Sequence, residues 1–471
     1  MEVVSNKRQL HIGVMITLLV MIVISLWLAF FAGDWEFECI RLLDDVSLVF
    51  KVDEVSGLFI AILDIAWICA GIYSFVYMKH EGKEERFYAF YLIAYLALAA
   101  MDFAGNLVTM YMCFELVTLS TFPLVMHSGS RESIMASLKY LLYSMCGAYM
   151  ALFGIFVLYR YSDSITFAAG GTLSAEVVSE KPFVVLLAVF LMVIGFGVKC
   201  GMFPLHSWLT AAHPVAPSPA SAVLSALIVK AGVLGIFRSV FYIVGAETIR
   251  GTWVQYAWMI LTLMTVFMGS MLAFREQILK KRLAYSTVSQ VSYILFGFAT
   301  LDSTAVTGSL LHVVYHAIIK SGLFLIAGVF LVNCNKRRVG ELVGIGKEMP
   351  VLLWSYTFLS LGLIGIPPTG GFISKWYLAV GSLETSGIGA FRWVGPMILL
   401  ISALLTAGYL LPITMRGFFP GDGFDETKVK RKEPDKQMLL PIVALAALTV
   451  LLGVFPNFVI DYASAIAKTI L

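Results

Sequence analysis

Residues 199–230 read KCGMFPLHSWLTAAHPVAPSPASAVLSALIVK, with a lysine at each end and apolar blocks on both sides. A helix cannot run through so many prolines, because each one removes an amide donor and crowds the preceding turn. The first helix is therefore predicted to break near residues 201–204. Ser218 and Pro219 predict the N-cap and the first position of a new helix. The prolines concerned are Pro204, Pro214, Pro217 and Pro219.

Lys230 is expected deep in the membrane. It follows Pro219 by eleven residues, which is about 17 Å at about 1.5 Å per helical residue. The apolar core of a bilayer is about 30 Å thick, so this lysine would lie near its middle. A lysine at that depth costs roughly 3 kcal/mol or more, and it therefore needs a partner, a water-filled cavity or a function.

The composition indicates a polytopic helical membrane protein. Of the 471 residues, 59% are hydrophobic and 13% are charged, whereas about 25% of a soluble domain is charged. The apolar residues form long blocks, as membrane-spanning helices require. No basic soluble stretch supports nucleic-acid binding. The six cysteines are scattered without a CxxC or Cys/His cluster, so neither a metal nor a cofactor is expected.

The apolar blocks predict about thirteen transmembrane helices, the first of which we expect to be a retained span rather than a cleaved signal peptide. An acidic linker at residues 32–54 follows it. The basic loops, including the one at residues 428–436, share one side if residues 350–378 form a single broken helix. The N-terminus is then inside and the C-terminus outside. The predicted spans are 11–31, 55–78, 87–104, 106–126, 134–159, 183–203, 218–241, 253–274, 283–300, 304–333, 350–378, 393–415 and 438–468.

Ionisable residues stand inside these predicted spans. Burial disfavours the charged form of such a group, whereas a neighbouring opposite charge favours it. A row of groups balanced in this way can pass protons or cations through intervening water, and broken helices offer free backbone ends to ions. His312, His316 and Lys320 are spaced by four and share one helical face. The candidate relay is Glu115, Lys199, Lys230, His312, His316, Lys320 and Lys375, with Asp64, Asp102, His206 and His213 as possible accessories.

Purely structural roles stay open for several of these residues. Glu115 and one lysine could simply lock two helices together. The face that carries His312 could be a hydrogen-bonded seam between helices. Asp64 could neutralise a charge on a partner subunit, and His206 and His213 could cap helix ends. A set this large is nevertheless costly to keep in a membrane for structure alone, which favours transport.

Several motifs resemble the antiporter-like subunits of respiratory complex I, of Mrp-type sodium/proton antiporters and of membrane-bound hydrogenases. Residues 198–221, VKCGMFPLHSWLTAAHPVAPSPAS, resemble the most specific signature of that family. The triplet FEL around Glu115, residues 312–323 and the segment GIPPTGGFISK at residues 365–375 resemble others. The resemblance runs from about residue 53 to the last span. It is closest to the D-type member of the Mrp antiporters or to the hydrogenase type, although Lys375 stands where some members carry glutamate.

The resemblance implies a particular domain organisation. Two inverted five-helix repeats, residues 87–241 and 253–415, would each contain one interrupted helix, near 201–204 and 365–371. Residues 1–86 would add N-terminal helices and the acidic linker, and residues 416–471 a basic cytoplasmic loop and a C-terminal helix.

The resemblance also implies roles for single residues. In the family, the glutamate that Glu115 matches pairs with the lysine that Lys199 matches. The positions of Lys230, His316 and Lys320 continue a hydrated axis toward that of Lys375. We add His312 to this link because it lies on the same helical face as His316 and Lys320. The site of Lys375 lies by the exit or by the next subunit.

Together, residues and resemblance predict a subunit that translocates protons or sodium ions within a multisubunit complex of a prokaryotic plasma membrane. Its expected partners are other membrane subunits, lipid and the ion. The chain itself is not expected to perform redox chemistry, although the complex could be an NADH, ferredoxin or hydrogenase-type oxidoreductase. The alternatives are a quinone-binding subunit of a redox complex and a structural subunit without its own ion path.

Overall fold

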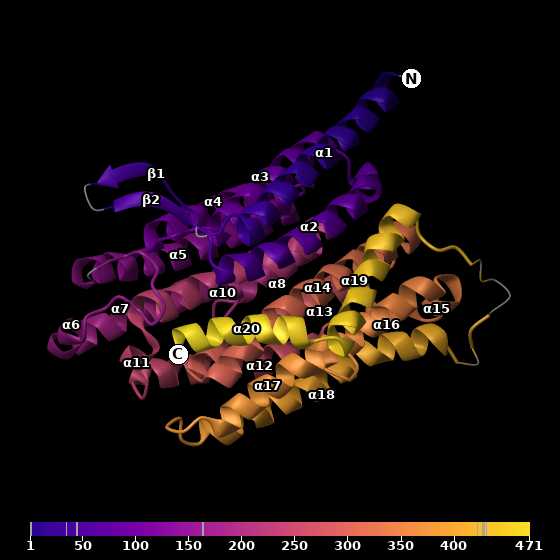
Figure 1. The fold of residues 1–471 in the computed structure, drawn as a ribbon. Helices are drawn as coiled ribbons and strands as arrows, with labels where there is room; N and C mark the ends of the chain where they lie inside the picture. The colour runs from indigo at the N-terminus through magenta and orange to yellow at the C-terminus, as the bar shows by residue number, and fades with distance from the viewer. Residues whose placement is uncertain are drawn as a thin grey trace.

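The computed structural model is a bundle of long helices that run roughly side by side (Figure 1). The structure describes residues 2–33, 35–43, 46–162, 164–421, 423–425, 429 and 431–471. Asp34, Asp44 and Asp45 of the predicted acidic linker, and Lys428 and Lys430 of the basic loop, lie outside the described residues.

Ten helical segments of the described chain are long and apolar enough to cross a membrane. Two further helices, α3 (Glu84–Asp102) and α13 (Leu279–Thr300), lie among them and are more polar. With the split pair α16 (Pro350–Ile364) and α17 (Gly370–Glu384), they confirm a polytopic all-helical fold of about thirteen spans. The ten are α1 (Glu2–Phe31), α2 (Glu54–Glu81), α4 (Leu107–Val125), α5 (Arg131–Tyr161), α7 (Pro182–Cys200), Ser218–Val244, α12 (Trp253–Arg275), α14 (Ser303–Cys334), α18 (Phe391–Phe418) and α19 (Lys436–Val454).

Both predicted helix breaks occur, and each begins at a glycine. α7 ends at Gly201, whose φ is +76°, and the short helix α8 (Ser207–Val215) follows. α16 ends at Gly365, whose φ is +90°, before α17 starts. Only glycine adopts such left-handed backbone at little cost, so these residues end the helices inside the bundle.

The helix after the first break differs from the prediction. Pro217, not Ser218, occupies the N-cap of α9 (Ser218–Val223), so the predicted cap is wrong by one residue. The span is also not a uniform α-helix, and π-helical turns of this kind often mark functional sites. It continues through the π turn η1 (Leu224–Ile228), α10 (Val229–Arg238) and a second π turn, η2 (Ser239–Val244).

The two ends of the chain contain structure that the apolar pattern did not predict. The acidic linker folds as an antiparallel hairpin of β1 (Glu36–Leu43) and β2 (Val46–Lys51). The predicted single span at 438–468 is wrong, because the chain forms two helices, α19 and α20 (Asn457–Ile470). Pro456 stands at their junction, where it cannot supply the amide that a continuous helix needs.

Close packing of α5 against α7 positions the first buried lysine. A Cβ atom on Gly195 of α7 would lie only 2.5 Å from the carbonyl oxygen of Gly147 on α5. Small residues allow membrane helices to approach in this way. The contact brings Tyr140 of α5 beside Lys199 of α7.

The basic loops meet at one end of the bundle. Glu81, Ser128, Ile278 and Lys336, which follow four different spans, line one cavity there. From the positive-inside rule we expect this end to face the cytoplasm. The N-terminus and α15 (Ile345–Glu348) lie toward that end in Figure 1, whereas the hairpin, α11 (Ala246–Ile249) and the C-terminus lie toward the other.

Candidate functional site

Lys199 lies in the last turn of α7, is 1% exposed and has only neutral hydrogen-bond partners among the described residues. Its Nζ donates to Thr118 Oγ1 at 2.8 Å and to the Tyr140 hydroxyl at 2.7 Å. The rings of Phe114 and Tyr140 have their centroids 5.4 and 4.7 Å from Nζ, within the range of cation–π attraction. Hydroxyl groups and aromatic rings therefore hold this ammonium group.

Glu115 is half-buried on α4 and accepts a hydrogen bond from Tyr111 at 3.4 Å. The ion pairs within the described chain do not include the expected pair of Glu115 with Lys199. The two groups interact electrostatically over a longer distance. Thr118, less than one turn along α4, takes the place beside the ammonium group that the carboxylate was expected to fill.

Lys230 meets a histidine from another helix in the middle of the bundle. Its Nζ lies 2.5 Å from His316 Nδ1 and 3.3 Å from the carbonyl oxygen of Ser225 in η1. Lys230 is 1% exposed and His316 is fully buried. Two positive charges so close together in a medium of low polarity would repel strongly, so the pair holds at most one extra proton.

His312, one turn from His316 on α14, joins three helices. Its Nδ1 lies 2.9 Å from Ser374 Oγ on α17, and its Nε2 lies 3.1 Å from Gln290 Oε1 on α13. Its ring stacks on Tyr293, with 5.6 Å between the ring centroids. The rings of His312 and His316 have their centroids 5.9 Å apart.

Lys375 occupies the second helix break. Its Nζ donates to the carbonyl oxygens of Leu363 and Ile364 at 2.6 and 2.9 Å. These are the last residues of α16, whose carbonyl groups lack helical partners and carry the negative end of the helix dipole. The same Nζ lies 5.1 Å from the ring centroid of Tyr293, so one tyrosine contacts both Lys375 and His312.

Lys320 lies on the cytoplasmic side of His316 along α14 and turns toward α13. It is fully buried and donates to the carbonyl oxygen of Leu283 at 2.9 Å and to Ser286 Oγ. It also interacts electrostatically with Lys230 and with His213. The three ionisable residues of α14 therefore share a face but contact three different helices.

The accessory candidates divide into two places. His213 is fully buried, stacks on Phe324 of α14, and finds no hydrogen-bond partner among the described residues for either ring nitrogen. His206 stands at the N-cap of α8 without capping it through its side chain. Asp64 and Asp102, in contrast, lie near α1 and α3 and do not join the lysines and histidines. Among the described residues, no group of three or more His, Cys, Asp or Glu side chains could hold a metal ion.

Several buried polar atoms beside these residues have no hydrogen-bond partner within the described part of the chain. Buried polar groups are normally hydrogen-bonded, and ordered water serves where the protein supplies no partner. The centre of the bundle is therefore suited to hold water molecules. The atoms are Gln290 Nε2, Ser292 Oγ, Tyr315 Oη, His316 Nε2 and Ser321 Oγ.

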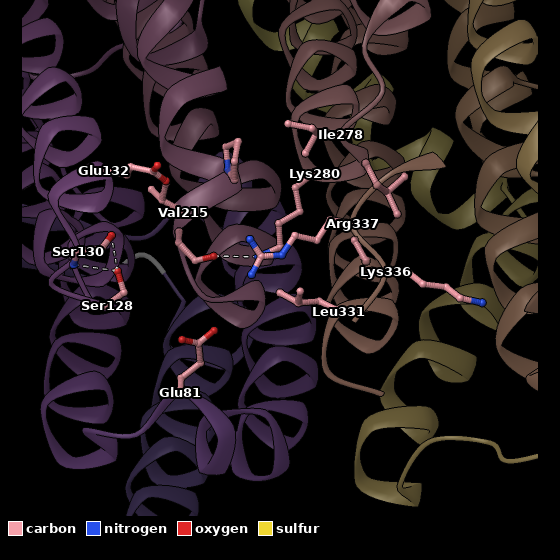
Figure 2. A pocket seen from close by; sticks show the side chains of 14 residues that line it. Glu81, Ser128, Ser130, Glu132, Val215, Ile278, Lys280, Leu331, Lys336 and Arg337 are labelled. Carbon is pink, nitrogen blue, oxygen red and sulfur yellow. Dashed lines mark hydrogen bonds between the residues drawn. The ribbon is translucent and has the colours of Figure 1, made fainter. Parts of the chain in front are cut away.

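A cavity of about 260 Å³ opens at the cytoplasmic end of the bundle (Figure 2). Lys280 of α13 points into it and donates to the carbonyl oxygen of Ala216, just after α8, at 2.9 Å. Glu81 and Glu132 line it from other helices. Ala327, two turns beyond Lys320 on α14, also lines it, so the cavity approaches the buried lysines from the cytoplasm.

The sequence pointed to the charged residues and missed their neutral partners. Thr118, Tyr140, Ser225, Gln290 and Ser374 contact the lysines and histidines, and none was predicted. One signal was available, because the predicted span 283–300 carries serines, threonines and a glutamine at positions that lipid would not favour. In the structure this helix, α13, is buried among the others.

Comparisons with known proteins agree on one family. The family model described as "NADH:quinone oxidoreductase/Mrp antiporter, TM" matches residues 104–419. NADH-quinone oxidoreductase subunit N of Desulforudis audaxviator is 33% identical over 87% of this chain and 82% of that protein. Hydrogenase-4 component B of Escherichia coli is 30% identical over 94% of this chain, which spans 65% of that longer protein.

The fold has the same relatives. A chain in the structure of the Mrp complex from Dietzia sp. DQ12-45-1b superposes with a TM-score of 0.84, covering all of this chain and 94% of that one, at 21% identity. The family model covers well over half of the chain, and the relative that is 33% identical is covered over most of its length. The chain therefore belongs to the NADH:quinone oxidoreductase/Mrp antiporter family of multi-pass membrane subunits.

Proposed function

We propose that the chain moves protons, or sodium ions, across the membrane as one subunit of a multisubunit complex. The observation that carries this proposal is the contact between Lys230 and His316, 2.5 Å from Nζ to Nδ1 at the centre of the bundle. Two titratable groups that share one proton in a buried site form a point where a proton can be received and passed on. The family relatives act in membrane complexes, which supports the same role.

The outward half of the route runs from His316 to the second helix break. The rings of His316 and His312 have their centroids 5.9 Å apart, and His316 Nε2, which has no hydrogen-bond partner among the described residues, offers a site for a water molecule on this route. His312 hands the proton toward Ser374, and Lys375 follows at the next position of α17. Lys375 Nζ donates to free carbonyl groups of α16. A lysine side chain has hydrogens to donate in both its charged and its neutral form, so these hydrogen bonds persist when a proton arrives or leaves.

The inward half starts at the cavity in Figure 2. His213 directly precedes Pro214, which lines that cavity, and Lys320 interacts electrostatically with both His213 and Lys230. Unpartnered ring nitrogens on His213 provide sites for water, and Lys320 adds a further group that can hold a proton. The cavity is the cytoplasmic mouth in this proposal.

Glu115 and Lys199 act as a modulating pair rather than a conducting one. Lys199 lies on α7, which packs against α10, and its Cβ would lie 3.0 Å from a Cβ atom added to Gly232, two residues after Lys230. In this proposal, a change of charge on Lys199 acts on Lys230 through the close packing of α7 against α10. Protonation of one lysine therefore favours loss of the proton from the other.

The domain organisation belongs to the same proposal. The two repeats, residues 87–241 and 253–415, each contain one broken helix, α7–α8 and α16–α17. Each break has a lysine within one or two helical turns, the buried Lys199 and the half-buried Lys375. An inverted pair of half-channels built in this way gives access from both sides to a shared centre.

The deciding experiment measures ion uptake by the purified complex in liposomes. Lys230→Ala is expected to abolish uptake, while Lys139→Ala, at the partly exposed surface of α5, leaves it unchanged. Unchanged uptake in Lys230→Ala complexes of normal subunit content would contradict the proposal. Replacing Na+ by choline at constant pH distinguishes the ion, and the subunits that co-purify identify the driving reaction.

A further inference from the structure

A second group of buried titratable residues lies away from the proposed ion route, where α1 packs against α2 and α3 (Figure 1). Asp64, on α2, is 4% exposed. It stands about 15 Å from the outer end of its helix at about 1.5 Å per residue, well inside the apolar layer. Its neighbours are Ser25 of the peripheral helix α1 and Tyr95 of α3.

The contacts of Asp64 involve no positive charge. Tyr95 Oη lies 2.6 Å from Asp64 Oδ1, and Ser25 Oγ lies 3.0 Å from Oδ2. None of the ion pairs within the described residues includes Asp64 or Asp102. A bare carboxylate at this depth is costly, and the usual remedy is to bind a proton or a cation.

A count of hydrogen atoms points the same way. Ser25 Oγ lies 2.9 Å from the carbonyl oxygen of Ile22, 2.8 Å from Tyr95 Oη and 3.0 Å from Asp64 Oδ2, and Tyr95 contacts Oδ1. These are four short oxygen–oxygen contacts, but the serine and the tyrosine supply only two hydrogens. With an ionised Asp64, two contacts would therefore bring lone pairs together. A proton on Asp64 supplies a third hydrogen, so only one of the four contacts is left without a hydrogen.

Asp102 gives an independent reason to place a proton here. It is 6% exposed, near the outer end of α3, and makes no hydrogen bond through its side chain among those of the described residues. It interacts electrostatically with Asp64 on one side and with Arg238 and Cys113 on others. Arg238 is already engaged by both carboxylate oxygens of Asp53, at 2.6 and 2.7 Å. Two carboxylates that interact electrostatically in an apolar site cannot both be charged cheaply, so one of them is expected to be neutral.

We propose that Asp64 and Asp102 form a second, peripheral proton-binding site at the junction of α1, α2 and α3. The pair carries one proton, which converts one carboxylate into a carboxylic acid and leaves the pair with a single negative charge. Asp102 is the last residue of α3, at the outer end of the bundle, and interacts electrostatically with both Asp64 and Arg238, so the site exchanges its proton with the outer side. Ser25 closes the site from α1.

The peripheral position distinguishes this site from the central lysines and histidines. α1 contacts the rest of the bundle along one seam, and Ile16, Val23 and Trp27 on its other face are exposed. Whatever covers that face in the membrane, lipid or a neighbouring subunit, therefore adjoins the helix that supplies Ser25. A shift of α1 changes the hydrogen bonds of Asp64 without moving Lys230.

Infrared spectroscopy of the intact complex tests the proposal. The wild-type complex at neutral pH is expected to show the carbonyl stretch of a buried protonated carboxyl group, and Asp64→Asn is expected to remove or shift it. Asp461→Asn, which alters an exposed carboxylate on α20, is the matched control and should remove no such band. If neither Asp64→Asn nor Asp102→Asn changes the spectrum in this region, the site holds no proton and the proposal is wrong.

Carbodiimide labelling identifies the occupant, because the apolar reagent dicyclohexylcarbodiimide reacts with protonated carboxyl groups. Mass spectrometry is expected to find Asp64 or Asp102 labelled, with labelling that decreases as the pH rises. Asp102→Asn should move the pH profile of Asp64 labelling to lower pH, since a neighbouring negative charge is lost. Protection by Na+ at constant ionic strength would overturn the assignment to a proton. Neither measurement depends on ion transport, so its outcome is independent of the test on Lys230.

Discussion

Lys230 and His316 lie 2.5 Å apart, from Nζ to Nδ1, although α10 and α14 carry them in different halves of the chain. The contact joins the two proposed repeats at a single pair of titratable nitrogens. Because both nitrogens can hold a proton and the pair can hold only one extra charge, the state of one residue decides the state of the other.

Removal of the histidine should stop transport as effectively as removal of the lysine. In His316→Leu complexes we expect ion uptake to fall by about 100-fold, the size typical of losing a positioned proton-transfer group. Uptake into liposomes measures the effect. Tyr73→Phe is the control, because it removes a buried hydrogen bond onto α14 from Tyr73 to the carbonyl oxygen of Leu325. Uptake in His316→Leu equal to that of the control would be evidence against the shared proton.

Tyr140 should matter for transport although it carries no charge. Tyr140→Phe removes a hydroxyl 2.7 Å from Lys199 Nζ. A hydrogen bond to a charged group contributes about 1.5 kcal/mol or more, so uptake should decrease by about tenfold. Tyr143 is also on α5, and Tyr143→Phe loses a hydrogen bond from Ser207 of α8 instead. It should leave uptake within twofold of wild type, since about 0.4 kcal/mol corresponds to a factor of two. Equal uptake rates for Tyr140→Phe and Tyr143→Phe complexes would contradict the modulating role proposed for Lys199.

Gly195→Ala should destabilise the bundle. The new Cβ would lie 2.5 Å from the carbonyl oxygen of Gly147, so α5 and α7 must separate. Overpacking of this kind costs about 1–3 kcal/mol, which a lower midpoint of thermal unfolding in detergent would reveal. Gly13→Ala on α1 is the control, since nothing lies within 4 Å of the added atom. A Gly195→Ala protein as stable as the control would mean that the two helices pack less closely.

The ion pair between Asp53 and Arg238 should stabilise the outer end of the fold. Arg238 is buried and grips both carboxylate oxygens of Asp53. Asp53→Asn leaves a buried guanidinium group without its counter-charge, a loss of order 3 kcal/mol. Thermal unfolding would measure it. Glu38→Gln, which affects the exposed pair with Arg41, should cost under about 0.5 kcal/mol.

The same pair gives a dependence on pH with a definite sign. Burial alone would raise the pKa of Asp53, but the charge of Arg238 and its hydrogen bonds outweigh burial and hold that pKa below its usual range. A carboxyl group whose pKa is lowered by folding stabilises the protein above its unfolded pKa of about 3.9, and that contribution is lost as the pH falls further. The stability difference between wild type and Asp53→Asn should therefore shrink below about pH 4. A difference that stays constant on acidification would exclude this linkage.

Much of the architecture follows from the sequence because its signals are local. Long apolar blocks indicate spans, and the glycines and prolines near Gly201 and Gly365 end helices wherever those helices pack. Signals for the start of a helix are less exact, as the misplaced cap at Ser218 illustrates. At the C-terminus, hydropathy averaged over many residues concealed the effect of Pro456.

The candidate site is less predictable because it depends on contacts between helices. Helical spacing correctly put His312, His316 and Lys320 on one face of α14, but it does not say that they meet three different neighbours. The choice of Thr118 and Tyr140 over Glu115 as hydrogen-bond partners of Lys199 depends on how α4, α5 and α7 approach one another. Burying a neutral hydroxyl or amide side chain in a membrane also costs much less free energy than burying a charge, so such residues do not stand out as functional candidates in a sequence.

A density map of the complex at a resolution that reveals ordered water tests the central claim most directly. We expect water molecules bound to His316 Nε2 and Tyr315 Oη, and a chain of further ones leading from Lys320 past His312 to Lys375. Apolar side chains packed against those atoms, with no density for water anywhere between Lys230 and Lys375, would contradict the proposed route.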